Sequence, residues 1–280
     1  MVSGVLYVVA TPIGNLEDIS PRAVGILKES DLILAEDTRH STVLLNHFGI
    51  QTPVTGFHEH NEQKLTVRII DRLKKGDSIA LISDAGTPLI NDPGYELVVA
   101  AHTEGIKVTP IPGPSAVISA LSVSGLPVDR FVYEGFLPAK SSLRRRYLQR
   151  LSEEQRTMVF YEVPHRVCSS LDDMIKCFGP GRMATLAKEL TKYYETVHKD
   201  TLGNLLVWLK EKEERQKGEF VLIVQGATPK ESDDTECLRV LGILLKYLTL
   251  KDAAAVAATL LDESKNRMYQ LALKLDGKDR

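Results

Sequence analysis

Short apolar runs alternate with helical patterns along the first 120 residues, and this alternation is the feature that most constrains the fold. The runs at residues 5–10, 32–35 and 78–83 are largely apolar, as expected of strands buried on both faces. Segments with helical signals follow them, each closed by glycine or a polar residue, at 20–29, 42–48, 61–75 and 95–104. Strands that alternate with helices build parallel sheets with helices on both faces. The sequence therefore predicts an α/β protein.

The second half of the chain is punctuated differently. Residues 125–140 carry two prolines and two glycines around an apolar strand, which is typical of a passage between two lobes. Further strands are predicted at 131–136, 158–163, 183–187 and 220–224, with helical stretches such as 143–151 and 202–212. Because the alternation is less strict here, we expect a second, mixed sheet.

The composition changes after Gly226. The run ATPKESDDTE at 227–236 reads as a polar linker, and helices are predicted at 237–248, 251–262 and 265–275. We therefore expect three parts: an N-terminal α/β lobe (1–116), a C-terminal α/β lobe (117–227) and a small helical, RNA-binding-like domain (228–280).

Cysteine usage and hydropathy indicate the compartment. The three cysteines show no CxxC spacing, so a disulfide framework or zinc ribbon is not expected. No apolar run reaches about 18 residues, and the first residues lack the pattern of a signal peptide. We expect a cytoplasmic protein without a membrane partner.

Four loops rich in glycine and proline follow predicted strands, where open parallel sheets bind their ligands. They are TPIGN at 11–15, SDAGTPLINDPG at 83–94, PGPSA at 112–116 and YEVPHR at 161–166. Glycine lets the backbone approach a ligand closely, although each loop alone is also what a tight βα turn requires. Together the four loops predict a site for a small polar ligand.

Several other kinds of site are disfavoured. The dinucleotide fingerprint GxGxxG does not follow the first strand, and neither the phosphate loop GxxxxGK[ST] nor the hydrolase motif GxSxG occurs. The cluster HEHNE at 58–62 lacks a third ligand at a known metal spacing. No metal site is predicted, and the cluster is expected to serve as a loop or helix cap.

Eight segments in order resemble one known family. They are TPIGNLEDISPRA, AEDTRHS, SDAGTPLINDPG, PGPSA, SGLPVDRFVYEGFLPAK, FYEVPHR, KELTKYYE and KGEFVLIVQG. These segments are similar to those of the tetrapyrrole-methylase superfamily, in the bacterial branch that methylates small-subunit ribosomal RNA. The tail segments KDAAAVAA and NRMYQLALKL resemble that branch's C-terminal helical domain.

The resemblance implies a two-lobed, class III S-adenosylmethionine methyltransferase fold and a homodimer. It also implies 2'-O-methylation of the ribose of cytidine 1402 in 16S rRNA of the 30S subunit. Porphyrin-type members carry a glycine-rich first loop and a GGDP-like second loop, whereas this chain has TPIGN and ISDA. This departure favours the rRNA branch. Carried over by position, the cofactor-binding residues are Pro12, Ser83, Asp84, Ala85, Thr87, Ser115, Ala116, Tyr161, Glu162 and Leu190.

Methyl transfer to a ribose hydroxyl gains from a general base or from a cation that stabilises the developing alkoxide. Our hypothesis assigns this role to Asp37, Lys188 and Glu189, in EDTR and KELTK. Each has a simpler reading, such as Asp37 capping the following helix or Lys188 lying on a solvated face. Other candidates stay open: Glu36, Glu162, His165 and Lys192.

Binding RNA requires local positive charge, because the whole chain carries a net charge of only −2. A cluster of arginines on a predicted helix is the first candidate surface: Arg144, Arg145, Arg146 and Arg150. The basic residues of the tail are the second: Lys246, Lys251, Lys265, Arg267 and Lys274.

Two other functions fit parts of this pattern. A methylase of a tetrapyrrole or another small molecule would explain the loops, but neither the tail nor the arginine cluster. An RNA-binding protein without enzymatic activity would explain the basic residues and would have no affinity for S-adenosylmethionine.

Overall fold

The computed structural model describes residues 4–228 and 234–277. Contacts divide the chain into two compact units, Met1–Ala227 and Thr228–Arg280. Both sheets lie within the first unit. The boundary expected between two lobes after residue 116 therefore stays a prediction. Five residues of the predicted polar linker, 229–233, lie outside the described part of the chain.

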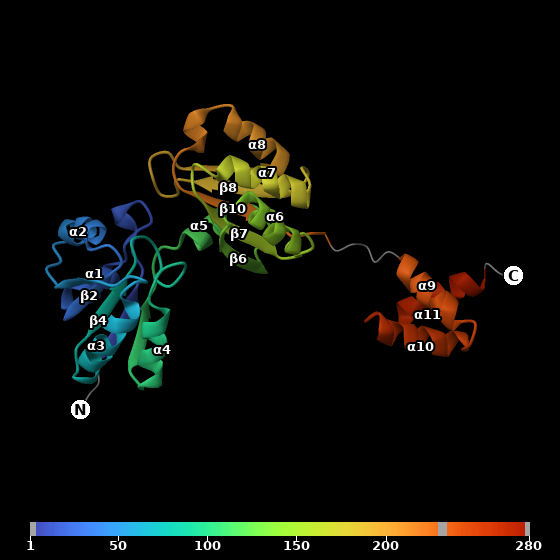
Figure 1. Ribbon diagram of the computed structural model, residues 1–280, viewed down its shortest axis with the longest axis horizontal. Coiled ribbons are helices and arrows are strands. Elements are labelled where there is room, and N and C mark those ends of the chain that lie inside the picture. Colours follow the sequence, from blue (N-terminus) through green and yellow to red (C-terminus); the bar gives the residue numbers. More distant parts are fainter. Residues whose placement is uncertain (1–3, 229–233, 278–280) are drawn as a thin grey trace. The chain divides into compact units, whose positions relative to one another are not determined.

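The first sheet is entirely parallel, with the order β3-β2-β4-β1-β5. Its strands are β1 (Val5–Val9), β2 (Leu32–Ala35), β3 (Val54–Gly56), β4 (Ile79–Ile82) and β5 (Lys107–Ile111). Its crossover helices are α1 (Pro21–Glu29), α2 (Thr38–His47), α3 (Glu62–Lys74) and α4 (Tyr95–Thr103). The prediction of an α/β fold is confirmed, as Figure 1 shows.

Alternate residues of these strands feed two hydrophobic cores, one on each face of the sheet. Leu6 and Leu34 pack with α3 and α4, whereas Val9 and Ile33 pack with α1 and α2. A strand buried on both faces has to be apolar throughout, and β2 and β4 are buried at every position. Burial on both faces therefore explains the continuous apolar runs in the sequence.

Capping residues set where the helices begin. Ser20 accepts a hydrogen bond from the Ala23 amide, and Pro21 occupies the first helical position, as predicted. The helix predicted at 42–48 instead begins at Thr38, because Asp37 caps it by accepting a hydrogen bond from the Arg39 amide. Asn61 occupies the N-cap position of α3, in agreement with the prediction for the HEHNE cluster.

The second sheet has the order β6-β7-β10-β8-β9 and is mixed, as predicted, because the β6–β7 pair is parallel and the other neighbouring pairs are antiparallel. Its strands are β6 (Phe131–Phe136), β7 (Thr157–Glu162), β8 (Met183–Lys188), β9 (Thr196–Thr201) and β10 (Phe220–Val224). The associated helices are α5 (Ala116–Val123), α6 (Ser141–Arg150), α7 (Val167–Phe178) and α8 (Leu202–Lys210). Short 3₁₀ turns occur at Leu16–Asp18 (η1) and Glu213–Gln216 (η2).

The two faces of the second sheet have different partners. Phe160, Leu186 and Leu222 pack in one core with α6, α7 and α8. The opposite face contributes Ala187 and other residues to a core shared with α5 and with Ile13, which follows β1. One face of the second sheet is thus in contact with a loop of the first, and this contact positions the candidate site described below.

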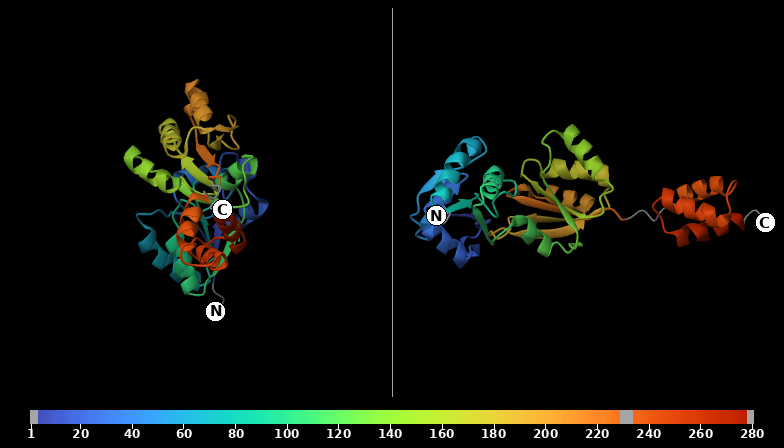
Figure 2. Two further views of the ribbon diagram at one scale, coloured as in Figure 1. Left: turned by 90° about the vertical axis from the view of Figure 1, so that its right-hand side faces the viewer. Right: turned by 90° about the horizontal axis from the view of Figure 1, so that it is seen from below.

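The second unit contains α9 (Asp234–Leu244), α10 (Leu250–Leu260) and α11 (Lys265–Asp276). The three helices share one small core that includes Leu241, Ala257 and Met268, and Figure 2 shows them packed together. The first of them was predicted at 237–248 but ends at Leu244, and residues 245–247 form a turn instead. No helix in the described part of the chain combines the length and hydropathy needed to cross a lipid bilayer.

Candidate functional site

A cavity of about 360 Å³ lies between the loops of the first sheet and one face of the second. This volume is at the lower end of the range for small-molecule sites. The cavity is lined by Ile13, Ala85, Gly86, Thr87, Ile90, Asn91, Asp92, Ser115, Ala116, Phe136, Tyr161, Glu162, Val163, Pro164, Ala187, Leu190, Glu219, Phe220 and Val221. All four loops singled out in the sequence contribute to this lining.

The loops that follow β1 and β4 are held together at the cavity. The backbones of Thr11 and Gly86 exchange two hydrogen bonds of 2.9 and 3.0 Å, and the Thr11 hydroxyl donates to the Ser83 carbonyl oxygen at 3.2 Å. Gly86 has a φ of +85°, which disfavours any other residue, and an added Cβ would lie 3.3 Å from Cγ2 of Ile13. Glycine is therefore required where the backbone lines the cavity.

The opposite wall consists of apolar and aromatic side chains of the second sheet. Tyr161, Ala187 and Val221 lie on the face turned to the cavity. The Tyr161 ring makes edge-to-face contacts with Tyr133 and Phe136, at centroid distances of 5.1 and 5.5 Å. This wall suits a flat apolar group, and the loops across from it supply polar atoms.

Seven of the ten predicted cofactor-binding residues line the cavity: Ala85, Thr87, Ser115, Ala116, Tyr161, Glu162 and Leu190. Pro12, Ser83 and Asp84 are absent from the lining. Pro12 and Ser83 are buried, and Asp84 accepts a hydrogen bond from the Asp37 amide at 3.0 Å. Asp84 therefore joins the loop after β4 to the start of α2.

Glu162 forms part of the wall but has few atoms available to a ligand. Its carboxylate accepts hydrogen bonds from the Ser170 hydroxyl, from Nε of Arg166 at 3.0 Å and from the Val163 amide at 2.8 Å. The residue is only 2% exposed. These hydrogen bonds hold the loop after β7 in place, and that loop contributes Val163 and Pro164 to the cavity lining.

Asp92 is a lining residue that the sequence analysis did not select, although it lies within the quoted loop SDAGTPLINDPG. Burial raises the pKa of its carboxyl group, the charge of Asp84 adds to this, and a hydrogen bond with Ser83 opposes it. Burial also raises the pKa of the nearby Glu36, with the charges of Asp92 and Asp84 as further causes. A carboxylate with a raised pKa in a ligand-sized cavity is suited to accept a proton.

The three predicted catalytic residues lie outside the cavity lining. Asp37 caps α2 and forms a 2.8 Å ion pair with Arg39, and the hydrogen bonds from Arg39 lower its pKa to about 2. In Glu189 burial raises the pKa, but hydrogen bonds from Glu219 and Lys192 outweigh it and leave the pKa lowered. Both carboxylates are thus weak bases.

Lys188, the last residue of β8, has its side chain bonded to η2. It alternates with Ala187, which lines the cavity, so its side chain shares the opposite face with Leu186. The residue is 8% exposed, and its Nζ donates to the Glu214 carbonyl oxygen at 3.0 Å. Lys188 lies outside the cavity lining with its ammonium group directed toward η2, and its role at the target ribose stays a prediction.

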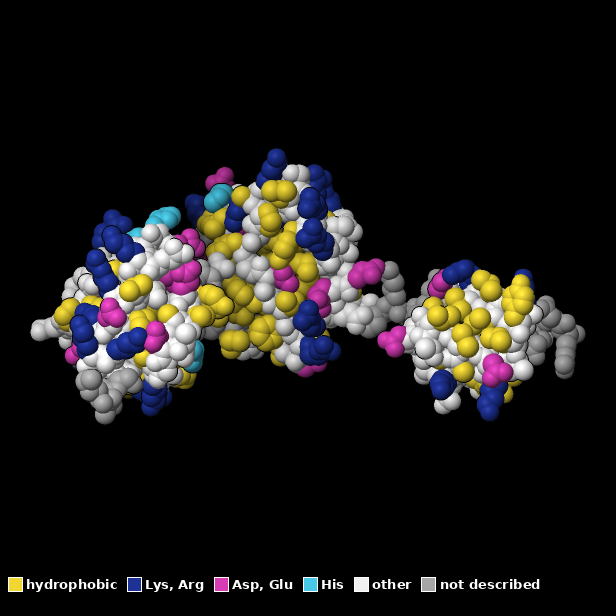
Figure 3. All heavy atoms as spheres, turned by 60° about the horizontal axis from the view of Figure 1, so that its bottom comes forward, with side chains coloured by type: hydrophobic (Ala, Val, Ile, Leu, Met, Phe, Trp, Pro, Cys, Tyr) yellow, Lys and Arg dark blue, Asp and Glu magenta, His cyan; other side chains and the backbone are white. Residues whose placement is uncertain are grey.

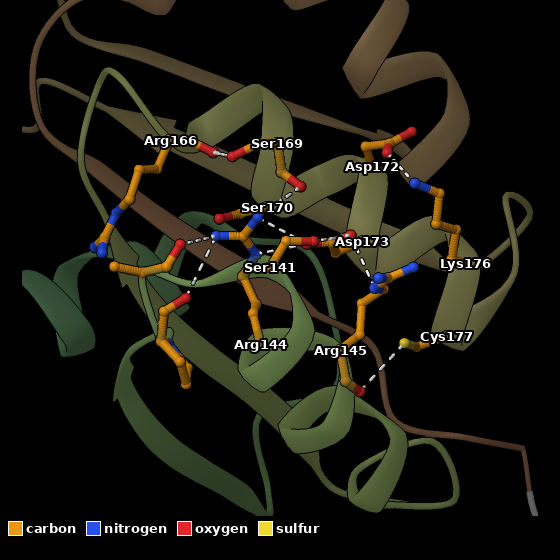
Figure 4. Close-up of polar contacts among 12 residues, drawn as sticks. Ser141, Arg144, Arg145, Arg166, Ser169, Ser170, Asp172, Asp173, Lys176 and Cys177 are labelled. Carbon is orange, nitrogen blue, oxygen red and sulfur yellow. Dashed lines mark hydrogen bonds and ion pairs between the residues drawn. The ribbon is translucent and has the colours of Figure 1, made fainter.

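The arginine cluster on α6 divides into buried and exposed members. Arg144 is 3% exposed, and its guanidinium group pairs with Asp173 of α7 at 2.7 Å, as Figure 4 shows. It also donates to the carbonyl oxygens of Pro138, Ala139 and Ser169. This side chain is buried and joins α6 to α7, so the structure shows a structural role for Arg144, and RNA binding by it stays a prediction. Arg145, Arg146 and Arg150 are exposed.

The helical unit carries both ionic and apolar surface. Arg267 pairs with Asp234 at 2.9 Å and with Glu263 at 2.6 Å, so its charge is compensated. Hydrophobic side chains gather on the face of this unit shown in Figure 3. The exposed large hydrophobic residues of the unit are Ile243, Tyr247, Leu248, Val256, Leu260, Tyr269 and Leu273.

In the described part of the chain, no group of three histidine, cysteine, aspartate or glutamate residues is arranged to hold a metal ion.

Comparison with known proteins identifies the family. Residues 5–206 match the Tetrapyrrole (Corrin/Porphyrin) Methylases, and residues 231–276 match the RsmI C-terminal HTH domain. Proteins named ribosomal RNA small subunit methyltransferase I are similar over nearly the full length. The protein from Pseudomonas aeruginosa is 53% identical over 99% of this chain and 100% of its own. The protein from Escherichia coli O157:H7 is 52% identical over 98% and 96%.

Solved structures of the same fold are more distant. Diphthine synthase aligns with a TM-score of 0.59 at 16% identity, covering 81% of this chain and 91% of that protein. Uroporphyrin-III-C-methyltransferase from Thermus thermophilus aligns with a TM-score of 0.54 at 19% identity, covering 79% and 94%. These two establish the fold alone. From the sequence matches, the chain belongs to the tetrapyrrole (corrin/porphyrin) methylase family and, within it, to the group of ribosomal RNA small subunit methyltransferase I.

Proposed function

We propose that the protein transfers a methyl group from S-adenosylmethionine to the ribose 2'-hydroxyl of cytidine 1402 in 16S rRNA of the small ribosomal subunit, in the cytoplasm. The observation that carries the proposal is the cavity between the loops of the first sheet and the aromatic face of the second, in a chain half identical to proteins named for methylation of this RNA. We also propose that the protein acts as a homodimer.

The residues around the cavity fit S-adenosylmethionine. The aromatic wall around Tyr161 and Phe136 suits the adenine ring, and Thr87, Asn91 and Ser115 offer polar atoms to the ribose and amino-acid parts. The backbone at Gly86 leaves room that a Cβ would fill. The predicted binding set also includes four further lining residues: Ala85, Ala116, Glu162 and Leu190. Its other members lie in the loops but outside the cavity lining: Pro12, Ser83 and Asp84.

In the proposed reaction, Asp92 acts as the proton acceptor. S-adenosylmethionine, when bound, supplies an electrophilic methyl group on its sulfonium. As the 2'-hydroxyl oxygen bonds to the methyl carbon, the bond from that carbon to sulfur would break and leave a neutral thioether. The Asp92 carboxylate would take the hydroxyl proton and later release it to water. Burial raises the pKa of Asp92, which makes its carboxylate a stronger base than an exposed aspartate. Asp37 and Glu189, whose pKa values are lowered, then serve as capping and loop-fixing residues.

RNA binding is proposed for two surfaces. Arg145, Arg146 and Arg150 of α6 are exposed and can contact phosphates. The second unit matches a helix-turn-helix domain, and a separate set of basic residues lies on it: Lys246, Lys251, Lys265 and Lys274. Arg267 is left out of this set, because it is held by Asp234 and Glu263.

An acceptor assay tests the function. The protein is incubated with labelled S-adenosylmethionine and unmethylated small subunits, naked 16S rRNA or a porphyrinogen. Label in the subunits or the rRNA supports the proposal, whereas label in the porphyrinogen would assign the chain to small-molecule methylation. Transfer to none of them, with no cofactor binding by calorimetry, would leave an RNA-binding protein without this activity.

We predict that Ala116→Phe abolishes binding of S-adenosylmethionine. Ala116 lines the cavity at the first position of α5, so a phenyl ring there fills space that the cofactor needs. Calorimetry is expected to show no binding heat, while circular dichroism stays unchanged. Ile118→Phe on the same helix is the control, because Ile118 is 55% exposed and lies outside the lining. Unchanged cofactor affinity in Ala116→Phe would exclude this cavity as the site.

A further inference from the structure

Two neighbouring tyrosines are exposed at the tip of the β8–β9 hairpin. Tyr193 is 92% exposed and Tyr194 is 70% exposed. Their rings meet edge to face at a centroid distance of 5.0 Å and an interplanar angle of 89°. Neither ring is buried in the described fold. Exposure of two adjacent aromatic rings to water is unfavourable, which points to a partner that covers them.

The hairpin tip that carries these rings is held by many polar contacts. The Thr191 amide donates to Glu195 at 2.6 Å, the Lys192 amide to the Glu189 carbonyl oxygen at 3.0 Å, and the Glu195 amide to the Lys192 carbonyl oxygen at 3.1 Å. Nζ of Lys192 bridges Glu189 and Glu219 at 3.2 and 2.9 Å. The rings are thus presented by an ordered loop, which lowers the entropic cost of binding.

The hairpin tip lies at the proposed cofactor site. Leu190, three residues before Tyr193, lines the cavity, and so does Glu219, which Lys192 contacts. On the other side, a Cβ at Gly14 would lie 2.5 Å from Cγ of Lys192, so the tip packs against the loop after β1. Tyr193 and Tyr194 are therefore carried by a loop that contributes Leu190 to the cavity lining.

We propose that Tyr193 and Tyr194 form a stacking platform for an unpaired RNA base next to the nucleotide that is methylated. This inference rests on the proposed function. Aromatic side chains bind unstacked bases through their faces, and recognition of single-stranded RNA depends on such contacts. The local charge of the tip is mixed, with Lys192 offset by Glu189 and Glu219, so stacking rather than phosphate attraction supplies the contact here.

The test compares Tyr193→Ala/Tyr194→Ala with Tyr193→Phe/Tyr194→Phe. Loss of the rings is expected to raise KM for the RNA substrate about 5- to 150-fold, the range for one lost base–aromatic stack. The phenylalanine variant keeps both ring faces and is expected to behave as the wild type. The affinity for S-adenosylmethionine should not change, and lowering the salt should not rescue the alanine variant. Tyr95→Ala is the matched control, since Tyr95 is 71% exposed on α4 and lies outside the cavity lining.

If the wild type methylates the RNA, any of three results would contradict the stacking role of Tyr193 and Tyr194. The first is an unchanged KM in the alanine variant, and the second is a loss of activity in the phenylalanine variant. The third is a change of oligomeric state, measured by sedimentation, when the rings are removed. The last result would mean that a second copy of the chain covers the tyrosines. Absence of methyl transfer by the wild type would instead contradict the proposed function itself.

Discussion

Replacing Asp92 with asparagine is expected to lower kcat about 10²- to 10⁴-fold, the usual contribution of a general base. The amide keeps the size of the carboxyl group but cannot accept the proton of the ribose hydroxyl. Because Asp92 is one of many residues lining the cavity, we expect binding of S-adenosylmethionine to persist. Single-turnover methylation and calorimetry on the same preparation separate the two effects.

The pH dependence of kcat gives an independent check. Only the ionised carboxylate accepts a proton, and burial raises the pKa of Asp92 above its ordinary value. The rate is therefore expected to rise with pH through this raised pKa and to level off above it. The Asp92→Asn variant should lose this limb of the profile.

Asp37→Asn discriminates between Asp92 and Asp37 as the general base. Asp37 caps α2 and its pKa is about 2, so the structure predicts a small loss of stability and no comparable fall in kcat. Two results together would favour Asp37 over Asp92 as the general base. Asp37→Asn would lose as much activity as Asp92→Asn, and Asp92→Asn would keep the wild-type pH profile.

Replacing Arg144 with alanine is expected to destabilise the first unit by about 3 to 5 kcal/mol, the cost of leaving one partner of a buried ion pair uncompensated. Both side chains of the Arg144–Asp173 pair are 3% exposed, and Ser141 adds a hydrogen bond of 2.9 Å to the same carboxylate (Figure 4). Removal of the guanidinium group leaves the buried carboxylate of Asp173 with Ser141 and a 3.8 Å contact to Nε of the exposed Arg145, and it frees three carbonyl oxygens.

Urea unfolding followed by fluorescence measures this effect, because the single tryptophan, Trp208, lies on α8 of the same unit. Arg150→Ala is the matched control from the same helix, and as an exposed substitution it should shift stability by no more than about 0.5 kcal/mol. The double variant Arg144→Leu/Asp173→Leu should recover part of the loss. An Arg144→Ala protein with wild-type stability but weakened RNA binding would contradict the structural role.

Much of the fold could be predicted because β2, β4 and β10 are buried at every position and are therefore apolar throughout their length. The elements that were missed lack this signal. Strand β3 has only three residues, and β9 (TVHKDT) is an edge strand with polar and charged residues along it. Their pairing depends on the neighbouring strands, which a local pattern does not contain.

The loops of the site could be predicted from glycine and proline, but the direction of single side chains could not. Lys188 alternates with Ala187 along β8, but the sequence does not contain its contact with the Glu214 carbonyl oxygen. Arg144 lies four residues before Leu148, which is fully buried, and this helical spacing was the available sign that it faces the core. Asp92 gave no such sign, because its burial arises from loops that are far apart in sequence.

The most direct test of the account is the chemical position of the transferred methyl group. Small subunits methylated by this protein with labelled S-adenosylmethionine are digested, and the label is mapped by mass spectrometry and by resistance of the neighbouring phosphodiester to alkali. The account predicts one methyl group on the ribose of cytidine 1402, an alkali-resistant linkage at that position, and no labelling by Ala116→Phe. A methyl group on a base, or an alkali-labile linkage at 1402, would contradict it.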